Sequence, residues 1–288
     1  MSNKEIKNLL IATRVTRTFP SISLIFFASA FAQKITTEIY LLSIILVLLY
    51  IPGGILNAIK DKDYSLPRYS KTIVILLPII ALIISSYSLK LFLAAIAWII
   101  FGFIYNVLSR KIILLDSSTL CVTHYFIPTF FTLMILGINL TTAFLIAFQM
   151  YMTVWFICPV KNLKGIKEDQ SLGYKTLATS FENGEKITKV LFHLSIIPIL
   201  ISLFFYNLNF ISLVFLSMLT IIYLFAHKII KIKDKNIALR MARLNVAFFA
   251  LSLTFSYTEN IPILILSSAI SLFFFAGLIK GIKTSFYK

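Results

Sequence analysis

The sequence predicts an all-α fold: a polytopic transmembrane helical bundle of nine to ten helices that forms one membrane domain over residues 1–288. The first observation is composition, because 59% of the residues are hydrophobic and only 13% are charged, whereas about a quarter of a soluble domain is charged. The second is the length of the apolar runs, many of which approach the ~20 residues that a spanning helix needs. A bilayer admits only helices or closed barrels. These runs lack the alternation of strands, so we expect helices.

Ten expected spans follow one another along the chain, and several of them are short. They lie near residues 18–33, 37–58, 71–88, 91–108, 119–137, 141–160, 187–206, 209–227, 241–257 and 261–279.

The basic residues predict how the bundle is oriented in the membrane. We place the N-terminus in the cytoplasm and let successive spans cross the membrane in alternating directions. All but two of the 27 Lys and Arg residues then fall on the cytoplasmic side. The exceptions are Lys34 and Lys90. This asymmetry follows the positive-inside rule, so we expect both termini in the cytoplasm and the chain in the cell (plasma) membrane. Topology thus explains the net charge of +16, and no nucleic-acid partner is expected.

Few ionisable residues fall at the centres of the spans, which disfavours a transporter. We interpret His124 and His193 as ordinary side chains that face the bundle interior. Cys121 and Cys158 lie inside apolar runs, so neither a disulfide framework nor a metal-ligand spacing is predicted. The acidic residues instead follow the cytoplasmic ends of helices, and we expect any chemistry there.

Two larger cytoplasmic loops, near residues 57–71 and 161–186, carry these polar residues. In the first loop, Asn57, Asp61 and Ser65 are spaced four residues apart, so they share one face if the helix continues through them. Amide and carboxylate oxygens suit a hard cation such as Mg²⁺, which often binds together with a substrate phosphate. This spacing favours a metal and phosphate site after the second span.

The second loop follows the sixth span and has a similar pattern. Asn162 and Asp169 are seven residues apart, again one face of a continuous helix. Two polar faces at equivalent depth can hold a diphosphate between them. On spacing alone, the same residues are equally consistent with ordinary solvated loops that bound membrane helices.

These loops resemble the UbiA superfamily of intramembrane prenyltransferases. Members have an N-x-x-x-D-x-x-x-D motif after the second helix and a D-x-x-x-D motif after the sixth, which commonly reads K-D-I-E-D-V-E-G-D-x-x-x-G-x-K-T-L. Residues 161–169 read K-N-L-K-G-I-K-E-D, and the matching positions that follow are Gly173, Lys175, Thr176 and Leu177. The Y-S-x-x-L-K-R segment after the fourth helix is similar to residues 105–111, which read Y-N-V-L-S-R-K. The resemblance covers about helices one to nine, and the tenth span looks like an extension.

The resemblance implies transfer of a prenyl group from a prenyl diphosphate donor to a lipophilic acceptor within membrane lipid. It implies that Mg²⁺ is held by Asn57, Asp61 and Asp169, with the two aspartates as the catalytic carboxylates. The implied contacts for the diphosphate or prenyl substrate are one aromatic and six basic residues. They are Lys62, Arg68, Tyr105, Arg110, Lys111, Lys164 and Lys175.

The chain departs from the family pattern at two acidic positions, because Ser65 and Gly165 stand where members carry Asp. Each missing carboxylate lowers the charge and number of ligands for Mg²⁺. Asp63 or Glu168 is a candidate replacement ligand. These losses leave an alternative open: a non-catalytic relative that binds an isoprenoid lipid or a membrane partner.

Overall fold

The computed structural model describes residues 3–60, 65–109, 111–163, 166–205 and, farther on, 261–262, 265–266 and 269. Within these ranges every regular element is a helix. The helices, with η marking 3-10 or π segments, have the following bounds: α1 Asn3–Thr13, η1 Val15–Thr18, α2 Phe19–Phe31, α3 Thr37–Lys60, α4 Ser70–Ser85, α5 Leu89–Val107, α6 Leu115–Cys121, η2 Val122–Phe126, α7 Ile127–Ile135, α8 Leu140–Trp155, η3 Cys158–Leu163, α9 Ile166–Ser171, α10 Leu177–Ser180, α11 Gly184–Leu194 and α12 Ile196–Phe205.

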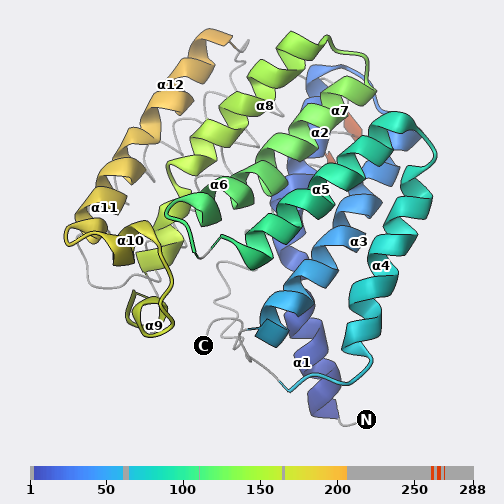
Figure 1. Cartoon of the computed structure of the whole chain (residues 1–288). Coiled ribbons are helices and arrows are strands. Elements are labelled where there is room, and N and C mark those ends of the chain that lie inside the picture. Colours follow the sequence, from blue (N-terminus) through green and yellow to red (C-terminus); the bar gives the residue numbers. More distant parts are fainter. Residues whose placement is uncertain are drawn as a thin grey trace.

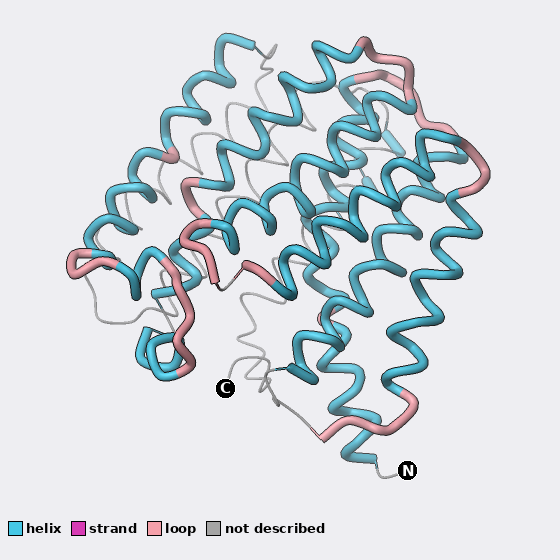
Figure 2. Tube along the Cα trace, viewed as in Figure 1, coloured by secondary structure: helices cyan, strands magenta, loops and turns pink. Residues whose placement is uncertain are grey.

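The helices from α2 to α8 lie side by side and connect at two opposite ends of the bundle (Figure 1). The α2–α3, α4–α5 and α7–α8 connections lie at one end, which is the upper end of Figure 2. The α3–α4 and α5–α6 connections lie at the other end, together with α9 and α10. We call this second end the motif end, because both sequence motifs fall there.

The all-helical membrane architecture predicted from the sequence is confirmed. Each of the first seven expected spans coincides with a helix or a run of consecutive helices. Four of these helices are long and apolar enough to cross a membrane: Thr37–Lys60, Leu89–Val107, Leu115–Ile135 and Leu140–Leu163. The last three expected spans, near 209–227, 241–257 and 261–279, lie outside the described residues except for five positions.

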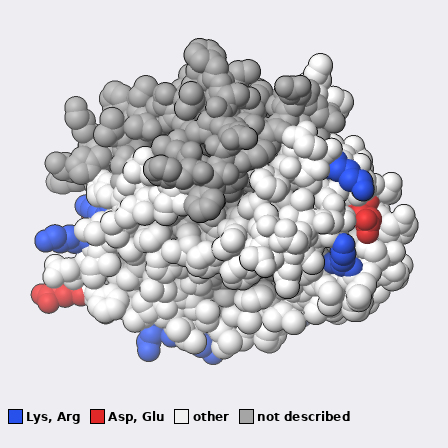
Figure 3. Space-filling view, turned by 90° about the horizontal axis from the view of Figure 1, so that it is seen from above, with Lys and Arg blue, Asp and Glu red and all other residues white. Residues whose placement is uncertain are grey.

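The core of the bundle is apolar, and so is much of its outer surface. One buried cluster joins Ile25 of α2, Leu42 of α3 and Leu91 of α5. By contrast, Ile83 and Phe103 point outward with about two thirds of their area exposed (67% and 64%). Large exposed apolar surfaces are suited to lipid contact. Figure 3 views the end opposite the motif end, where the described surface is mostly uncharged with scattered charged side chains.

Close packing against α1 fixes the last turns of α3 at the motif end. A Cβ atom added to Gly54 would lie 2.6 Å from the carbonyl oxygen of Ala12 and 2.8 Å from that of Thr13. Real Cβ atoms do not approach backbone oxygens so closely. Only glycine therefore lets α1 cross α3 one turn before Asn57.

Candidate functional site

The first motif begins at Asn57, which lies in the last turn of α3 and is 6% exposed. Helix α3 ends at Lys60, whose Nζ donates a hydrogen bond of 2.9 Å to the carbonyl oxygen of Asn106 in α5. Asp61 and Lys62 lie outside the described residues. This end of α3 is therefore joined to α5 immediately before the predicted metal ligand Asp61.

The shared face of Asn57, Asp61 and Ser65 requires a helix that includes Ser65, and this condition is not met. Residues 65–67 have no helical structure, and the carbonyl oxygen of Ser65 accepts a hydrogen bond of 3.1 Å from Asn8 Nδ2 in α1. Pro67 supplies a physical reason, because a proline disfavours helical conformation in the residue before it. Ser65 thus belongs to a loop that contacts α1 rather than to a helical face shared with Asn57.

The second motif is also divided between two helices, so the prediction of one face shared by Asn162 and Asp169 is wrong. Asn162 lies in the 3-10 segment η3, and Asp169 lies in the separate helix α9. A 3-10 helix has 3.0 residues per turn rather than 3.6, so η3 does not keep the α-helical register that the prediction assumed. Asn162 is buried, whereas Asp169 is partly exposed.

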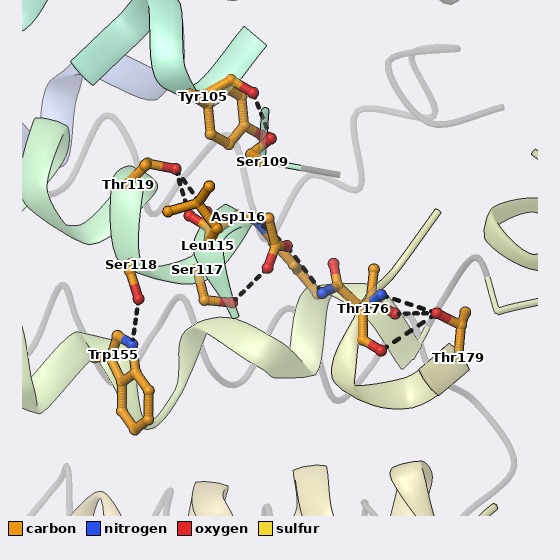
Figure 4. A network of polar contacts seen from close by, with 12 residues as sticks. Tyr105, Ser109, Leu115, Asp116, Ser117, Ser118, Thr119, Trp155, Thr176 and Thr179 are labelled. Carbon is orange, nitrogen blue, oxygen red and sulfur yellow. Dashed lines mark hydrogen bonds and ion pairs between the residues drawn. The ribbon is translucent and has the colours of Figure 1, made fainter. Parts of the chain in front are cut away.

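A buried carboxylate from α6 holds the start of this second motif. Asp116 is 6% exposed, and its Oδ2 atom lies 3.1 Å from Lys161 Nζ and 3.0 Å from Asn162 Nδ2. Its Oδ1 atom accepts a hydrogen bond of 3.2 Å from Ser117 Oγ. Figure 4 shows Asp116 at the centre of this network. A buried charge is stable only when it is paired and hydrogen-bonded, so Asp116 ties η3 to α6.

Lys161 extends the network to a third helix, α5. Its Nζ atom lies 5.6 Å from the ring centroid of Tyr105, a distance suited to a cation–π contact. The carbonyl oxygen of Tyr105 accepts a hydrogen bond from Ser109 Oγ. Tyr105, predicted from the resemblance as a substrate contact, is thus placed beside the second motif. We call Tyr105, Asp116, Ser117, Lys161 and Asn162 the Asp116 cluster.

Sequence reasoning missed Asp116 and gave Lys161 no role of its own. The available signal was an acid at the edge of an apolar run, since ionisable residues close to a membrane span usually have a specific partner. Its partners are 45 and 46 residues away in the chain, and no local pattern indicates such a pairing.

The remaining candidate contacts are dispersed over the motif end. Arg68 in the α3–α4 loop, Lys111 in the α5–α6 connection and Lys175 before α10 are all exposed. Arg110 and Lys164 lie outside the described residues. The roles assigned to these basic residues stay predictions.

The oxygen donors of the two motifs fit Mg²⁺ by their chemistry. Among the residues that the structure describes, no three His, Cys, Asp or Glu side chains come together as a metal site. Asn57 supplies an amide oxygen and Asp169 a carboxylate, and Asp61 would add a second carboxylate from outside the described part. Carboxylate and amide oxygens are the ligands that hard cations take.

Comparison with known proteins gives the fold and the family. The model of the UbiA prenyltransferase family matches residues 65–253, while a search of curated protein sequences finds no match. The apo structure of a UbiA homolog from Aeropyrum pernix K1 superimposes with a TM-score of 0.67 at 13% identity, covering 90% of this chain and 98% of that one. A structure described as a digeranylgeranylglyceryl phosphate synthase in membranes gives a TM-score of 0.56 at 16% identity, with coverage of 96% and 99%. Because the family model matches well over half of the sequence, this chain belongs to the UbiA prenyltransferase family.

Proposed function

We propose that this chain transfers a prenyl group from a polyprenyl diphosphate to a lipophilic acceptor inside the membrane, and that it depends on Mg²⁺. Family membership supports a prenyltransferase-type activity. The observation that carries the proposal is the Asp116 cluster, in which Asp116 contacts both Lys161 and Asn162. This cluster holds the start of the second motif at the same end of the bundle as the last turns of α3 (Figure 1), which carry Asn57.

In this proposal the two motifs hold Mg²⁺ through Asn57, Asp61 and Asp169. When bound, the metal supplies positive charge that stabilises the diphosphate leaving group. Exposed basic side chains at the motif end, such as Arg68 and Lys175, contact the diphosphate oxygens. The proposed orientation places the motif end in the cytoplasm, where a soluble diphosphate head group can reach it while the prenyl chain stays among apolar helices.

The surroundings of Tyr105 suit the reactive end of the donor. When the carbon–oxygen bond to diphosphate breaks, its electron pair leaves with the diphosphate and an allylic carbon is left with positive charge. Lys161 lies near the ring of Tyr105, and a ring that attracts one cation can also attract the positive charge of the donor, which supports this role. The apolar bundle interior excludes water, so the acceptor rather than water supplies the electron pair of the new bond to the allylic carbon, and the proton that the acceptor loses passes to the released diphosphate.

The test is prenyl transfer by the purified full chain in nanodiscs, with radiolabelled geranylgeranyl diphosphate, a panel of lipophilic acceptors, and Mg²⁺ or EDTA. We expect Mg²⁺-dependent product and a loss of at least about 100-fold in kcat/KM for Asp61→Asn and Asp169→Asn, the size expected when a group stabilising transition-state charge is removed. Glu182→Gln is the matched control, because Glu182 is an exposed acid at the same end of the bundle, and it should leave turnover unchanged.

Two results contradict the proposal. Turnover that survives both aspartate substitutions would remove their assigned roles. Binding of the diphosphate without Mg²⁺ and without any product would favour the non-catalytic isoprenoid-binding relative.

A further inference from the structure

A π-helical turn interrupts the membrane helix between α6 and α7. In this turn, η2, the backbone N–H of Ile127 donates to the carbonyl oxygen of Val122, five residues back. The carbonyl of Thr123, which Ile127 would reach in an α-helix, instead accepts a hydrogen bond of 2.8 Å from the indole Nε1 of Trp98. Pro128 adds a further break, because it has no N–H to donate. Such turns inside helices frequently occur at functional sites.

The π turn carries His124, which points toward two other helices. His124 Nδ1 lies 3.0 Å from Ser21 Oγ in α2. The ring of Tyr50 in α3 meets the imidazole edge-on, with centroids 5.0 Å apart and an interplanar angle of 66°. Three segments far apart in sequence thus converge on one imidazole within the membrane bundle. An ionisable residue at such a depth indicates a functional site.

One side of the imidazole is available to a ligand. Among the residues that the structure describes, the hydrogen bond of His124 is the one to Ser21, made at Nδ1. The residue as a whole is partly rather than fully buried. Because the described part of the chain gives Nε2 no hydrogen bond, this atom can bind a molecule that enters the bundle.

The His124 group lies deeper than the motif end. Tyr50 precedes Asn57 by seven residues on α3, and His124 follows Asp116 by eight residues. At a rise of 1.5 Å per residue, both separations correspond to about 10–12 Å along the bundle. A donor whose diphosphate binds at the motif end directs its prenyl chain inward, so a second substrate beside the reactive carbon has its far end near His124.

The polar chemistry of this group favours a neutral hydroxyl. A neutral imidazole nitrogen donates or accepts according to its tautomer, and the Ser21 hydroxyl adapts to either. A ligand hydroxyl also does both, so it fits each tautomer. An isolated ionised group in the bundle interior would be costly to desolvate.

We propose that Ser21, Tyr50 and His124 form a subsite for the lipophilic acceptor, in which His124 Nε2 hydrogen-bonds an acceptor hydroxyl. This inference rests on the proposed prenyl transfer for its role and on the geometry of η2 for its location. His124 acts as a binding residue that orients the acceptor.

The chain carries its own reporter for this subsite. It has two tryptophans, and Trp98 is hydrogen-bonded to Thr123, the neighbour of His124. In the Trp155→Phe variant, Trp98 is the remaining tryptophan of the chain. We would titrate this protein in lipid vesicles with 4-hexylphenol and with hexylbenzene, which lacks the hydroxyl group and so can neither donate to nor accept from the imidazole. The readout is the saturable change of Trp98 emission.

The phenol should bind about tenfold more tightly than hexylbenzene, the upper range for one buried neutral hydrogen bond. His124→Leu in the same background should reduce this ratio to about one, and His124→Gln should retain most of it because glutamine keeps the hydrogen bond. When this ratio of the two affinities is compared between variants, the difference in membrane partitioning of the two ligands cancels. Ser21→Ala is the second variant if His124→Leu does not fold, and it should lower the ratio about threefold by freeing the imidazole orientation.

A ratio that stays unchanged in both His124→Leu and Ser21→Ala overturns the subsite. Steady-state assays separate this failure from that of the proposed function. If the protein forms no product but the phenol preference still depends on His124, prenyl transfer fails and the hydroxyl site stands. If Mg²⁺-dependent transfer occurs and acceptor KM is the same in His124→Leu, the subsite alone fails.

Discussion

Different interactions hold the two motif segments in position, the end of α3 and the start of the second motif in η3. The end of α3 is fixed by backbone packing, since Gly54 lets α1 approach so closely that a methyl group has no room. The start of the second motif is fixed by charge, since Asp116 contacts both Lys161 and Asn162. The proposed site therefore combines a sterically fixed half and an electrostatically fixed half.

This difference shows which changes each half tolerates. Packing is sensitive to added volume and indifferent to charge, whereas a buried ion pair is sensitive to the loss of either partner. It also bears on the two acids missing from the family pattern at Ser65 and Gly165. Asp116 brings a carboxylate to this end of the bundle, but Lys161 neutralises it, so it adds no net negative charge to attract a metal.

The largest expected effect is that of Asp116→Ala. The change leaves Lys161 without its partner in a largely buried position, and breaking a buried pair on one side costs about 3–5 kcal/mol. We expect this loss in the free energy of unfolding, measured by denaturant titration in detergent micelles with circular dichroism.

The double variant Asp116→Asn/Lys161→Met tests whether charge is the cause. Removing both charges leaves neither one unpaired, so most of the lost stability should return. If the double variant is as unstable as Asp116→Ala, the cluster stabilises η3 by shape and the contrast with α3 disappears.

An intermediate effect is expected for Gly54→Ala. The new Cβ would clash with the carbonyl oxygens of Ala12 and Thr13, and such overpacking costs about 1–3 kcal/mol. Gly102→Ala is a matched control, because a Cβ there meets no atom within 4 Å. It should instead stabilise α5 by about 0.5–1 kcal/mol. Thermal unfolding of the two variants in the same detergent gives the comparison, and equal stabilities would show that α1 can move away from α3.

The sequence was sufficient for the bundle but not for the contacts that shape its site. Apolar runs of membrane length predicted the first seven spans, because hydropathy is a local property. Asn57 and Asp169 became candidates through their spacing and the motif resemblance, and their roles stay predictions. Asp116 was not, because its pairing with Asn162 spans 46 residues. His124 was interpreted as an ordinary interior side chain, because no local pattern indicates the π turn or its hydrogen bond from Trp98, 25 residues away.

The smallest expected effect is that of Lys60→Met, which tests whether α3 also relies on a polar tether. Lys60 Nζ donates to the carbonyl oxygen of Asn106 across an exposed contact, and one such hydrogen bond contributes about 0.5–1 kcal/mol. Methionine keeps the apolar stem and removes the charge, so the free energy of unfolding should fall by no more than this amount. A loss as large as that of Asp116→Ala would show that charge fixes both halves of the site. A small loss, together with the steric penalty at Gly54, leaves packing as the determinant of the α3 half.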